Sequence, residues 1–378
     1  MLLIIFARLN GGLTMNIREL RNMFPALSRT VYGKQLVYFD NAATAQRSQS
    51  VIDKWTQLTI GANANIHRAV HKLAVDATDE YESTRDAVKE YINAAAREEI
   101  VFTSGTTGSI NLVAFSFGET FVNKGDEIIV SESEHHSNIV PWQMLCQRKG
   151  AVLRVLHVDE DGHLNLEELK SLLNPKTRIV AVTQISNVLG ILNPVKEIVS
   201  VCHSVGCPVL IDGAQGMVHE GVDVQDVDCD FYAFSGHKLY AATGTGVLYG
   251  KRKWLDQMVP YQGGGEMIAT VRFSGTTYAP LPEKFEAGTQ NINAIPTLEP
   301  AIEMLKLMKD KELLNAQEAV SQYLLHALTS NPRIRLYGVP RGTETKIPLF
   351  SFSVEGAHHE DLALILDKMG IAVRSGQM

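Results

Sequence analysis

The sequence predicts an α/β fold built on a mainly parallel sheet, followed by a second, smaller α+β domain. Between residues 40 and 249, helical patterns alternate with short apolar, β-branched runs, which is typical of parallel strands covered by helices on both faces. After Pro296 the pattern changes to long helical stretches around one apolar run. A length of 378 residues also suits two domains, at about 150 residues each.

We expect the large domain to span residues 31–295. Its strands are predicted at 99–103, 127–130, 178–183, 208–212 and 231–234. The small domain is expected to combine residues 15–30, with an amphipathic helix at 17–23, and residues 296–378. Within the latter, a helical pattern at 297–329 precedes an apolar run at 347–354 and a helix at 360–369.

Composition and charge narrow the classes of partner. The net charge of −7 favours no nucleic-acid partner. The apolar opening at residues 1–9 lacks the features of a signal peptide and is too short to span a membrane. We therefore interpret residues 1–14 as an over-extended start, and we expect a cytoplasmic protein.

The four cysteines are too sparse for a disulfide framework, which favours a reducing compartment. Cys202, His203 and Cys207 invite a metal interpretation, but no second pair of ligands follows them. Buried structural thiols are commoner in such a stretch. No metal site is expected.

Lys238 follows the apolar run Phe231–Phe234, within the motif Ser-Gly-His-Lys. A lysine that bonds covalently to a carbonyl cofactor needs a partly desolvated amine, because burial lowers its pKa. Ser235 and His237 can donate to a phosphate, and the glycine between them lets the backbone approach. The motif indicates a lysine that carries pyridoxal-5′-phosphate (PLP), with a solvated loop lysine as the alternative.

Asp212 ends another apolar run, upstream of Lys238. A carboxylate at the end of a buried strand is costly unless it is paired. The pyridinium N–H of PLP would be such a partner, and the salt bridge would keep the ring a good electron sink. Gln215 could donate to the phenolic oxygen of the ring. Capping of the next helix is the alternative role for Asp212.

Two further motifs follow strand-like runs. The small residues of Ser104–Ser109 open a predicted helix, where free N–H groups and the helix dipole can hold a phosphate. His135 follows the run at 127–130 and could stack on a cofactor ring and relay protons. Each signal is weak alone, but all of them fall at successive strand ends, where ligands of such sheets bind.

Together these motifs resemble the class V aminotransferase superfamily, and within it the SufS/CsdA-type (group II) cysteine desulfurases. The resemblance runs from about residue 17 to the last residue. It implies the PLP-dependent transferase fold type I, with a sheet of the seven-stranded type. The matching stretches are Tyr38–Thr44, Asn65–Arg68, Ser104–Thr107, Glu134–Gln143, Ser186–Gly190, Asp212–Gln215, Ser235–Lys238, Gly263–Met267 and Phe285–Thr289.

The resemblance implies a role for each matched residue. Lys238 would carry PLP and His135 would stack on its ring, and both would be catalytic. Asp212 would pair with the pyridine nitrogen, and Gln215 and Asn187 would lie by the phenolic oxygen. The phosphate would be held by Thr106, Thr107, Ser235, His237 and, from the neighbouring subunit, Thr289. The substrate pocket would be lined by Asn41, His67, Asn187 and Arg374.

The resemblance also implies an activity and partners. Members of the family are homodimers that convert L-cysteine to L-alanine and pass the sulfur on as a persulfide. The acceptor is a protein of the iron–sulfur cluster assembly system, and several members also act on selenocysteine. We expect the same reaction, the same cofactor and a homodimer here.

Three positions depart from the family pattern. The motif Arg-[Ser/Thr]-Gly-x-x-Cys begins at Arg374 and reaches Met378, so the sulfur-accepting cysteine and the closing segment are expected after Met378. Gly108 stands where the family usually has an acidic residue, and Ser104 where it often has an arginine. These two changes are expected to alter communication between subunits.

Two other functions stay open. Without that cysteine, the protein would bind PLP but not mobilise sulfur, and would serve as a dimer partner or scaffold. Another class V activity, such as cysteine sulfinate desulfination or kynurenine cleavage, needs no enzyme thiol. Such an activity would release sulfite or anthranilate.

Overall fold

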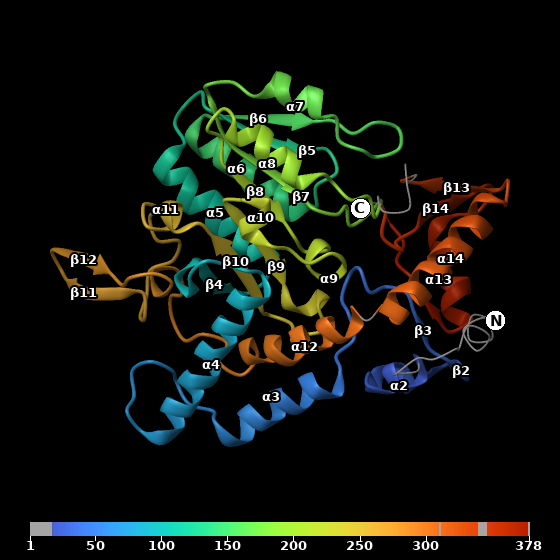
Figure 1. Ribbon diagram of the computed structural model, residues 1–378, viewed down its shortest axis with the longest axis horizontal. Coiled ribbons are helices and arrows are strands. Elements are labelled where there is room, and N and C mark those ends of the chain that lie inside the picture. Colours follow the sequence, from blue (N-terminus) through green and yellow to red (C-terminus); the bar gives the residue numbers. More distant parts are fainter. Residues whose placement is uncertain (1–16, 310, 339–345, 377–378) are drawn as a thin grey trace.

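The computed structural model describes residues 17–309, 311–338 and 346–376, so the predicted over-extended start lies outside the described residues. A seven-stranded sheet forms its centre (Figure 1). The strands are β4 (Ile100–Thr103), β5 (Glu127–Ser131), β6 (Val152–Leu156), β7 (Thr177–Thr183), β8 (Val209–Asp212), β9 (Phe231–Ser235) and β10 (Gly246–Gly250).

The order across the sheet is β4-β10-β9-β8-β7-β5-β6. Strand β10 runs antiparallel to both of its neighbours, and all the other pairs are parallel. The predicted α/β fold with a mainly parallel sheet is confirmed. The predicted strands at 178–183, 208–212 and 231–234 each agree with the observed bounds to within one residue at either end.

Strand β7 shows why this sheet needs a layer of helices on each face. Val180 and Val182 belong to one buried apolar cluster, and Ile179 and Ala181 to another. Because successive side chains point to opposite faces, a strand that is apolar throughout must be covered on both sides. The continuous apolar run in the sequence has this physical cause.

The helices divide between the two clusters. The cluster with Val180 receives side chains from α3 (Gln49–Gly61), α4 (Lys72–Tyr91), α7 (Leu166–Leu172), α8 (Val195–His203), α9 (Gly216–His219), α10 (Val224–Val227) and α12 (Leu298–Met308). The cluster with Ile179 receives side chains from α5 (Thr106–Phe121), α6 (Val140–Lys149) and α11 (Arg252–Leu255). Short 3-10 helices are η1 (Pro25–Ser28), η2 (Arg97–Glu99), η3 (His136–Asn138), η4 (Gly236–Lys238), η5 (Glu283–Phe285) and η6 (Ile295–Thr297).

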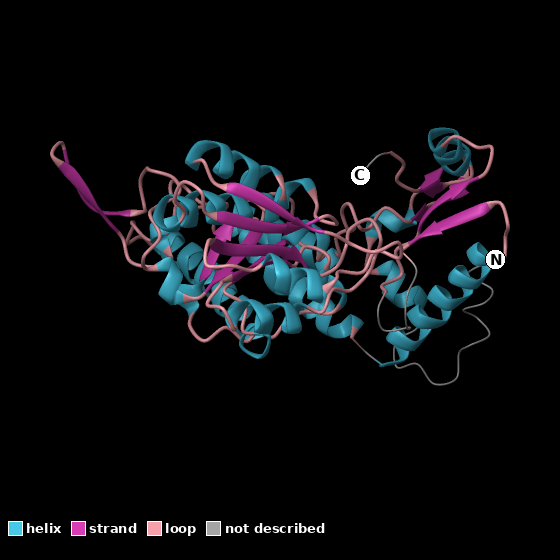
Figure 2. Ribbon diagram, turned by 90° about the horizontal axis from the view of Figure 1, so that it is seen from above, coloured by secondary structure: helices cyan, strands magenta, loops and turns pink. Residues whose placement is uncertain are grey.

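Most of the remaining elements lie together at one end of the molecule (Figures 1 and 2). Three small two-stranded sheets pair β1 with β2, β13 with β14 and β3 with β15. The last of these pairs is parallel and joins residues far apart in the sequence. The elements are α2 (Ile17–Asn22), β1 (Thr30–Val31), β2 (Lys34–Gln35), β3 (Val37–Tyr38), α13 (Lys311–Thr329), β13 (Ile334–Tyr337), β14 (Ser351–Val354), α14 (His359–Lys368) and β15 (Ile371–Ala372).

The single helical pattern predicted at 297–329 is in fact two helices, α12 and α13. Helix α12 closes at Lys309, whose N–H is shared between the carbonyls of Leu305 and Lys306, and such tightening is a common way for a helix to end. The proposed domain boundaries at 30/31 and 295/296 stay predictions.

At the opposite end, the hairpin of β11 (Ile268–Arg272) and β12 (Gly275–Tyr278) extends away from the body (Figure 2). Val271 and Tyr278 are exposed, and Phe273 at the tip is fully exposed. The sequence analysis did not predict this hairpin. None of the described helices combines the length and apolar character needed to cross a bilayer.

Candidate active site

The predicted site residues collect at one edge of the sheet. Strands β5, β7, β8 and β9 are parallel, and β4 has the same direction because β10 is antiparallel to both β4 and β9. Their carboxyl ends therefore meet at one edge, where α/β sheets bind ligands. The residues at or just after these ends are Thr106, His135, Asn187, Asp212, Ser235, His237 and Lys238.

The start of α5 forms a cradle of small residues. Ser235 Oγ lies 2.7 Å from both the backbone nitrogen and Oγ1 of Thr106. Gly105 caps the helix with a φ of 147°, a backbone conformation that favours glycine. A Cβ on Gly246 would lie 2.3 Å from Gly105 Cα, so no side chain fits between them. This close-packed helix N-terminus suits a phosphate.

Lys238 lies in η4, directly after β9. Burial lowers the pKa of its amine, although Asp212 opposes this effect by raising it. The neighbouring His237 is anchored through Nδ1, which lies 3.2 Å from Thr44 Oγ1. A lysine with a lowered pKa is suited to carry a carbonyl cofactor and to accept protons.

Asp212 is only 3% exposed at the end of β8. Burial raises its pKa, while the N–H of Ala214, which donates to Oδ1 at 2.9 Å, and the charges of Lys238 and His135 lower it. Within the described residues, no basic side chain forms a salt bridge with Asp212. A buried carboxylate of this kind fits a cationic ring nitrogen.

His135 is the N-terminal cap of η3 and lies close enough to Lys238 and Asp212 for both to affect its pKa, which burial and then Lys238 lower. Its Nδ1 accepts from the N–H of Ser137 at 3.1 Å. The neutral ring therefore carries its proton on Nε2. An imidazole held in one tautomer can relay a proton.

Glu134, just before His135, is buried beneath this edge, and the sequence analysis gave it no role. Its carboxyl group contacts Ser131 Oγ and accepts from Asn138 Nδ2 at 2.7 Å and from the N–H of Thr183 at 2.8 Å. Burial raises its pKa to about 8, against the effect of these donors. The group ties the His135 segment to the end of β7.

The segment after β3 contacts this edge of the sheet through Gln215. Gln215 Nε2 donates to the carbonyl of Ala42 at 2.7 Å, and Asn41 Nδ2 donates to Tyr38 at 3.1 Å. Arg374 makes a two-point ion pair with Asp40, at 2.9 and 3.0 Å. The charge of Arg374 also lowers the pKa of Lys238.

Three of the predicted residues do not join this group. Thr107 and Thr289 are exposed, and His67 is bonded to Glu82 instead. Among the described residues, neither His67 nor Thr289 has a hydrogen bond to Lys238, Asp212 or Ser235. Asn187 is partly buried in the loop after β7.

The thiols of the described residues are poorly suited to nucleophilic attack. Cys146, Cys202, Cys207 and Cys229 are free and buried. Burial raises the pKa of all four, that of Cys202 to about 12, so at neutral pH they are thiols and not the reactive thiolates. No metal-binding cluster occurs among the described residues.

The residues present fit PLP. The cradle at α5 suits its phosphate, buried Asp212 its ring nitrogen, and Lys238 its carbonyl carbon.

Comparison with known proteins shows the family of the chain. The model of the aminotransferase class-V family matches residues 37–378. The cysteine desulfurase of Pectobacterium carotovorum is 46% identical over 361 residues, or 95% of this chain and 88% of that protein.

The chain belongs to the cysteine desulfurases of the class-V aminotransferase family. Solved structures support the same assignment. The cysteine desulfurase CsdA of Escherichia coli, in its S-sulfonic acid form, has a TM-score of 0.84 and 38% identity, covering 96% of this chain and 88% of that one. The apo cysteine desulfurase of Thermococcus onnurineus has a TM-score of 0.87 and 33% identity, covering 97% and 89%. The predicted family and the predicted PLP-dependent enzyme class are confirmed.

The two internal departures from the family pattern are neighbours in space. A Cβ at Gly108 would lie 2.9 Å from Ser104 Oγ. Gly108 is the third residue of α5, and Ser104 lies two residues before this helix. Both changes therefore lie at the start of α5.

Proposed function

We propose that this desulfurase binds PLP on Lys238 and converts L-cysteine to L-alanine. The observation that carries the proposal is the mutual proximity of Lys238, Asp212 and His135 at the carboxyl edge of the sheet. Lys238 and Asp212 each affect the pKa of the other, and both affect the pKa of His135. Two bases and one buried acid around a phosphate cradle are the groups that PLP chemistry needs.

When bound, PLP supplies an electron sink for the bond that breaks at the substrate Cα. Lys238 Nζ, with its lowered pKa, takes and returns the Cα proton. Asp212 keeps a proton on the ring nitrogen, because its buried carboxylate gains a cationic partner there. His135 covers the ring and can hold a proton at Nε2, the nitrogen left free by Ser137.

Arg374 is the residue we propose for the substrate carboxylate. Its guanidinium is about half exposed and already holds a carboxylate, that of Asp40, by two hydrogen bonds. The planar fork of arginine matches such groups. The substrate would replace Asp40 at this fork, with Asn41 and Asn187 lining the same pocket.

We propose that the sulfur leaves the substrate as a persulfide on an enzyme thiolate, and the four described thiols are poor candidates for that role. All four described thiols are buried with raised pKa values, which argues against each of them. From the persulfide, the sulfur would pass to an acceptor protein of iron–sulfur cluster assembly. Selenocysteine is proposed as a second substrate.

We also propose a cytoplasmic homodimer. Four free thiols suit a reducing compartment. Exposed Thr289 suits a phosphate contact in the neighbouring subunit.

The test is incubation of the PLP-loaded protein with L-cysteine and a reductant, with alanine and sulfide measured together. We expect equal amounts of both. Lys238→Ala should form neither product and should lack the visible absorbance band of bound PLP. Lys251→Ala, which removes a lysine that bonds Asp228 instead, should keep both. A normal band in Lys238→Ala would refute the assignment.

Burial of the four described thiols favours a second candidate, cysteine sulfinate desulfination, which needs no enzyme thiol. The same assay with cysteine sulfinate decides between the two. Sulfite release that is much faster than sulfide release would support this candidate over desulfuration.

A further inference from the structure

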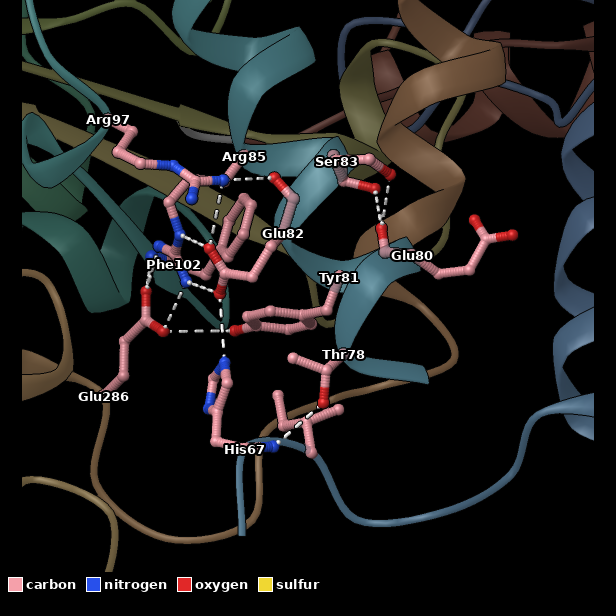
Figure 3. A network of polar contacts seen from close by, with 12 residues as sticks. His67, Thr78, Glu80, Tyr81, Glu82, Ser83, Arg85, Arg97, Phe102 and Glu286 are labelled. Carbon is pink, nitrogen blue, oxygen red and sulfur yellow. Dashed lines mark hydrogen bonds and ion pairs between the residues drawn. The ribbon is translucent and has the colours of Figure 1, made fainter. Parts of the chain in front are cut away.

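Arg85 is a fully buried guanidinium that the proposed reaction does not use. It lies on α4 and is 1% exposed (Figure 3). Nη1 and Nη2 donate to the two oxygens of Glu286 at 2.7 and 2.9 Å, and Nε and Nη2 donate to Glu82 at 3.0 and 3.2 Å. One cation thus holds two carboxylates from distant parts of the sequence.

The pair also covers the free edge of the sheet. Strand β4 is an edge strand, and Arg85 Nη1 donates to the carbonyl of Ile100 at 2.8 Å. Glu286 Oε1 accepts from the N–H of Phe102 at 2.7 Å. Edge strands need such cover for their unpaired backbone groups, so a purely structural role is the alternative against which any further role is tested.

One carboxylate leads to His67. Glu82 Oε1 lies 3.1 Å from His67 Nε2, and this hydrogen bond raises the pKa of the imidazole (Figure 3). The backbone N–H of His67 donates to Thr78 Oγ1 at 3.0 Å, and the ring meets Tyr81 edge-on. The predicted substrate residue is therefore fixed by contacts to α4 through its ring and through its backbone.

The other carboxylate leads to Thr289, the predicted phosphate ligand. Glu286 is buried three residues earlier, and Gly288 donates to the carbonyl of Gly265 at 3.0 Å. Glu266, the residue after Gly265, forms an ion pair with Arg68 at 2.8 Å. Arg68 directly follows His67. Three stretches of the family pattern, those with His67, Glu266 and Thr289, are therefore linked to Arg85 through neighbouring contacts.

We propose that Arg85 is a positioning residue that sets the loop of His67 and the segment of Thr289 as one rigid unit, which the neighbouring subunit's PLP site uses. The inference rests on the proposed function, since it requires PLP and a homodimer. If the proposal is right, Arg85 affects PLP binding at Lys238 of the other chain. If Arg85 only covers the edge of the sheet, its substitution affects PLP binding in its own chain.

Two mixed dimers with identical sets of substitutions separate these roles. In the first, an Arg85→Lys chain pairs with a Lys238→Ala chain. In the second, both substitutions are on one chain and its partner is wild type. Each dimer, purified through two different tags, retains one Lys238 and therefore one visible PLP band. The reference is a wild-type chain paired with a Lys238→Ala chain.

The measurement is the decay of that band while alkaline phosphatase destroys free PLP. We expect release about tenfold faster than the reference in the second dimer, as a weakened charge-assisted contact would give, and within about twofold of the reference in the first. Fast release in the first dimer only, or equal release in both, would overturn the inference. A wild-type protein that is monomeric or shows no band would instead overturn the proposed function, and this inference with it.

A milder variant covers the case in which Arg85→Lys fails to fold. Glu82→Gln keeps the Arg85–Glu286 pair and weakens the contacts that Glu82 makes with His67 and Arg85. In the second arrangement, L-cysteine should change the visible PLP band with a half-saturating concentration about tenfold higher than in the reference. PLP release should be unchanged. No difference between the arrangements would again overturn the inference.

Discussion

At the scale of single residues, the site depends on groups whose protonation is set by burial. Asp212 and Lys238 both lie where desolvation disfavours their charged forms, and each lowers that cost for the other. Bound PLP would add a cationic ring nitrogen beside Asp212. The arrangement is therefore more favourable with cofactor than without it.

Replacing Asp212 with asparagine keeps the size of the side chain and removes the charge. PLP should still bind, but exchange of the α-proton of L-alanine with deuterium should slow by about two orders of magnitude, because the ring nitrogen loses its partner. Proton NMR measures the exchange. Asp228→Asn, at an exposed carboxylate, is the matched control. Wild-type exchange in Asp212→Asn would contradict the pairing.

Some single residues of the site could be predicted from the sequence and others could not. Lys238, Asp212 and His135 could be singled out because each stands just after an apolar run. Asp40 could not, because its role depends on Arg374, 334 residues away. Glu134 could not either, since nothing local shows that a carboxylate within a polar stretch is buried.

At the scale of elements, the ends of strands control the cradle. Continuous apolar runs made β7, β8 and β9 predictable. Strand β10 reads like its parallel neighbours, so its reversed direction could not be predicted from its sequence. The exposed strands of the β11–β12 hairpin have no buried face and therefore no alternation to detect.

Gly246→Ala tests the contact between β10 and the start of α5. Its Cβ would meet the backbone of Gly105 at 2.3 Å, so the cradle must shift. We expect PLP affinity to fall at least about tenfold, as the loss of one charge-assisted contact would give. Titration of the visible band measures it. Gly61→Ala, in α3 with nothing within 4 Å, should bind PLP normally.

Glu82→Gln tests the ion network of α4 through pH. Although burial opposes it, hydrogen bonds from His67 and Arg85 lower the folded-state pKa of Glu82 from 4.5 to about 2. The unfolded state therefore binds more protons between these values, and the stabilisation is complete above pH 4.5 and lost as the pH falls towards 2.

The variant should lower the free energy of unfolding by roughly 2 kcal/mol at pH 7, after allowance for partial exposure of the carboxylate. The deficit should shrink at pH 4 and again at pH 3. Urea unfolding at these three pH values measures it. A deficit that is independent of pH would show that the charge of Glu82 does not stabilise the fold.

At the scale of the whole molecule, the hairpin exposes apolar side chains that a soluble monomer rarely presents together. Phe273→Asp should shift the protein from a dimer, with twice the mass of the 41.7 kDa chain, towards a monomer in sedimentation velocity. Val205→Asp, at another exposed apolar position, should leave the mass unchanged. An unaltered dimer in Phe273→Asp would exclude the hairpin tip from the interface.

The parallel pairing of β3 with β15 has a consequence for biosynthesis. Val37 pairs with Ile371, so the contact between Arg374 and Asp40 cannot form until residue 374 has left the ribosome. All seven strands of the central sheet end by Gly250, so their pairing can begin earlier, before α12 and Glu286 cover the sheet. A nascent chain would therefore form the cradle at the start of α5 before the proposed substrate residue Arg374 is in place, and PLP bound at that cradle would stabilise the intermediate.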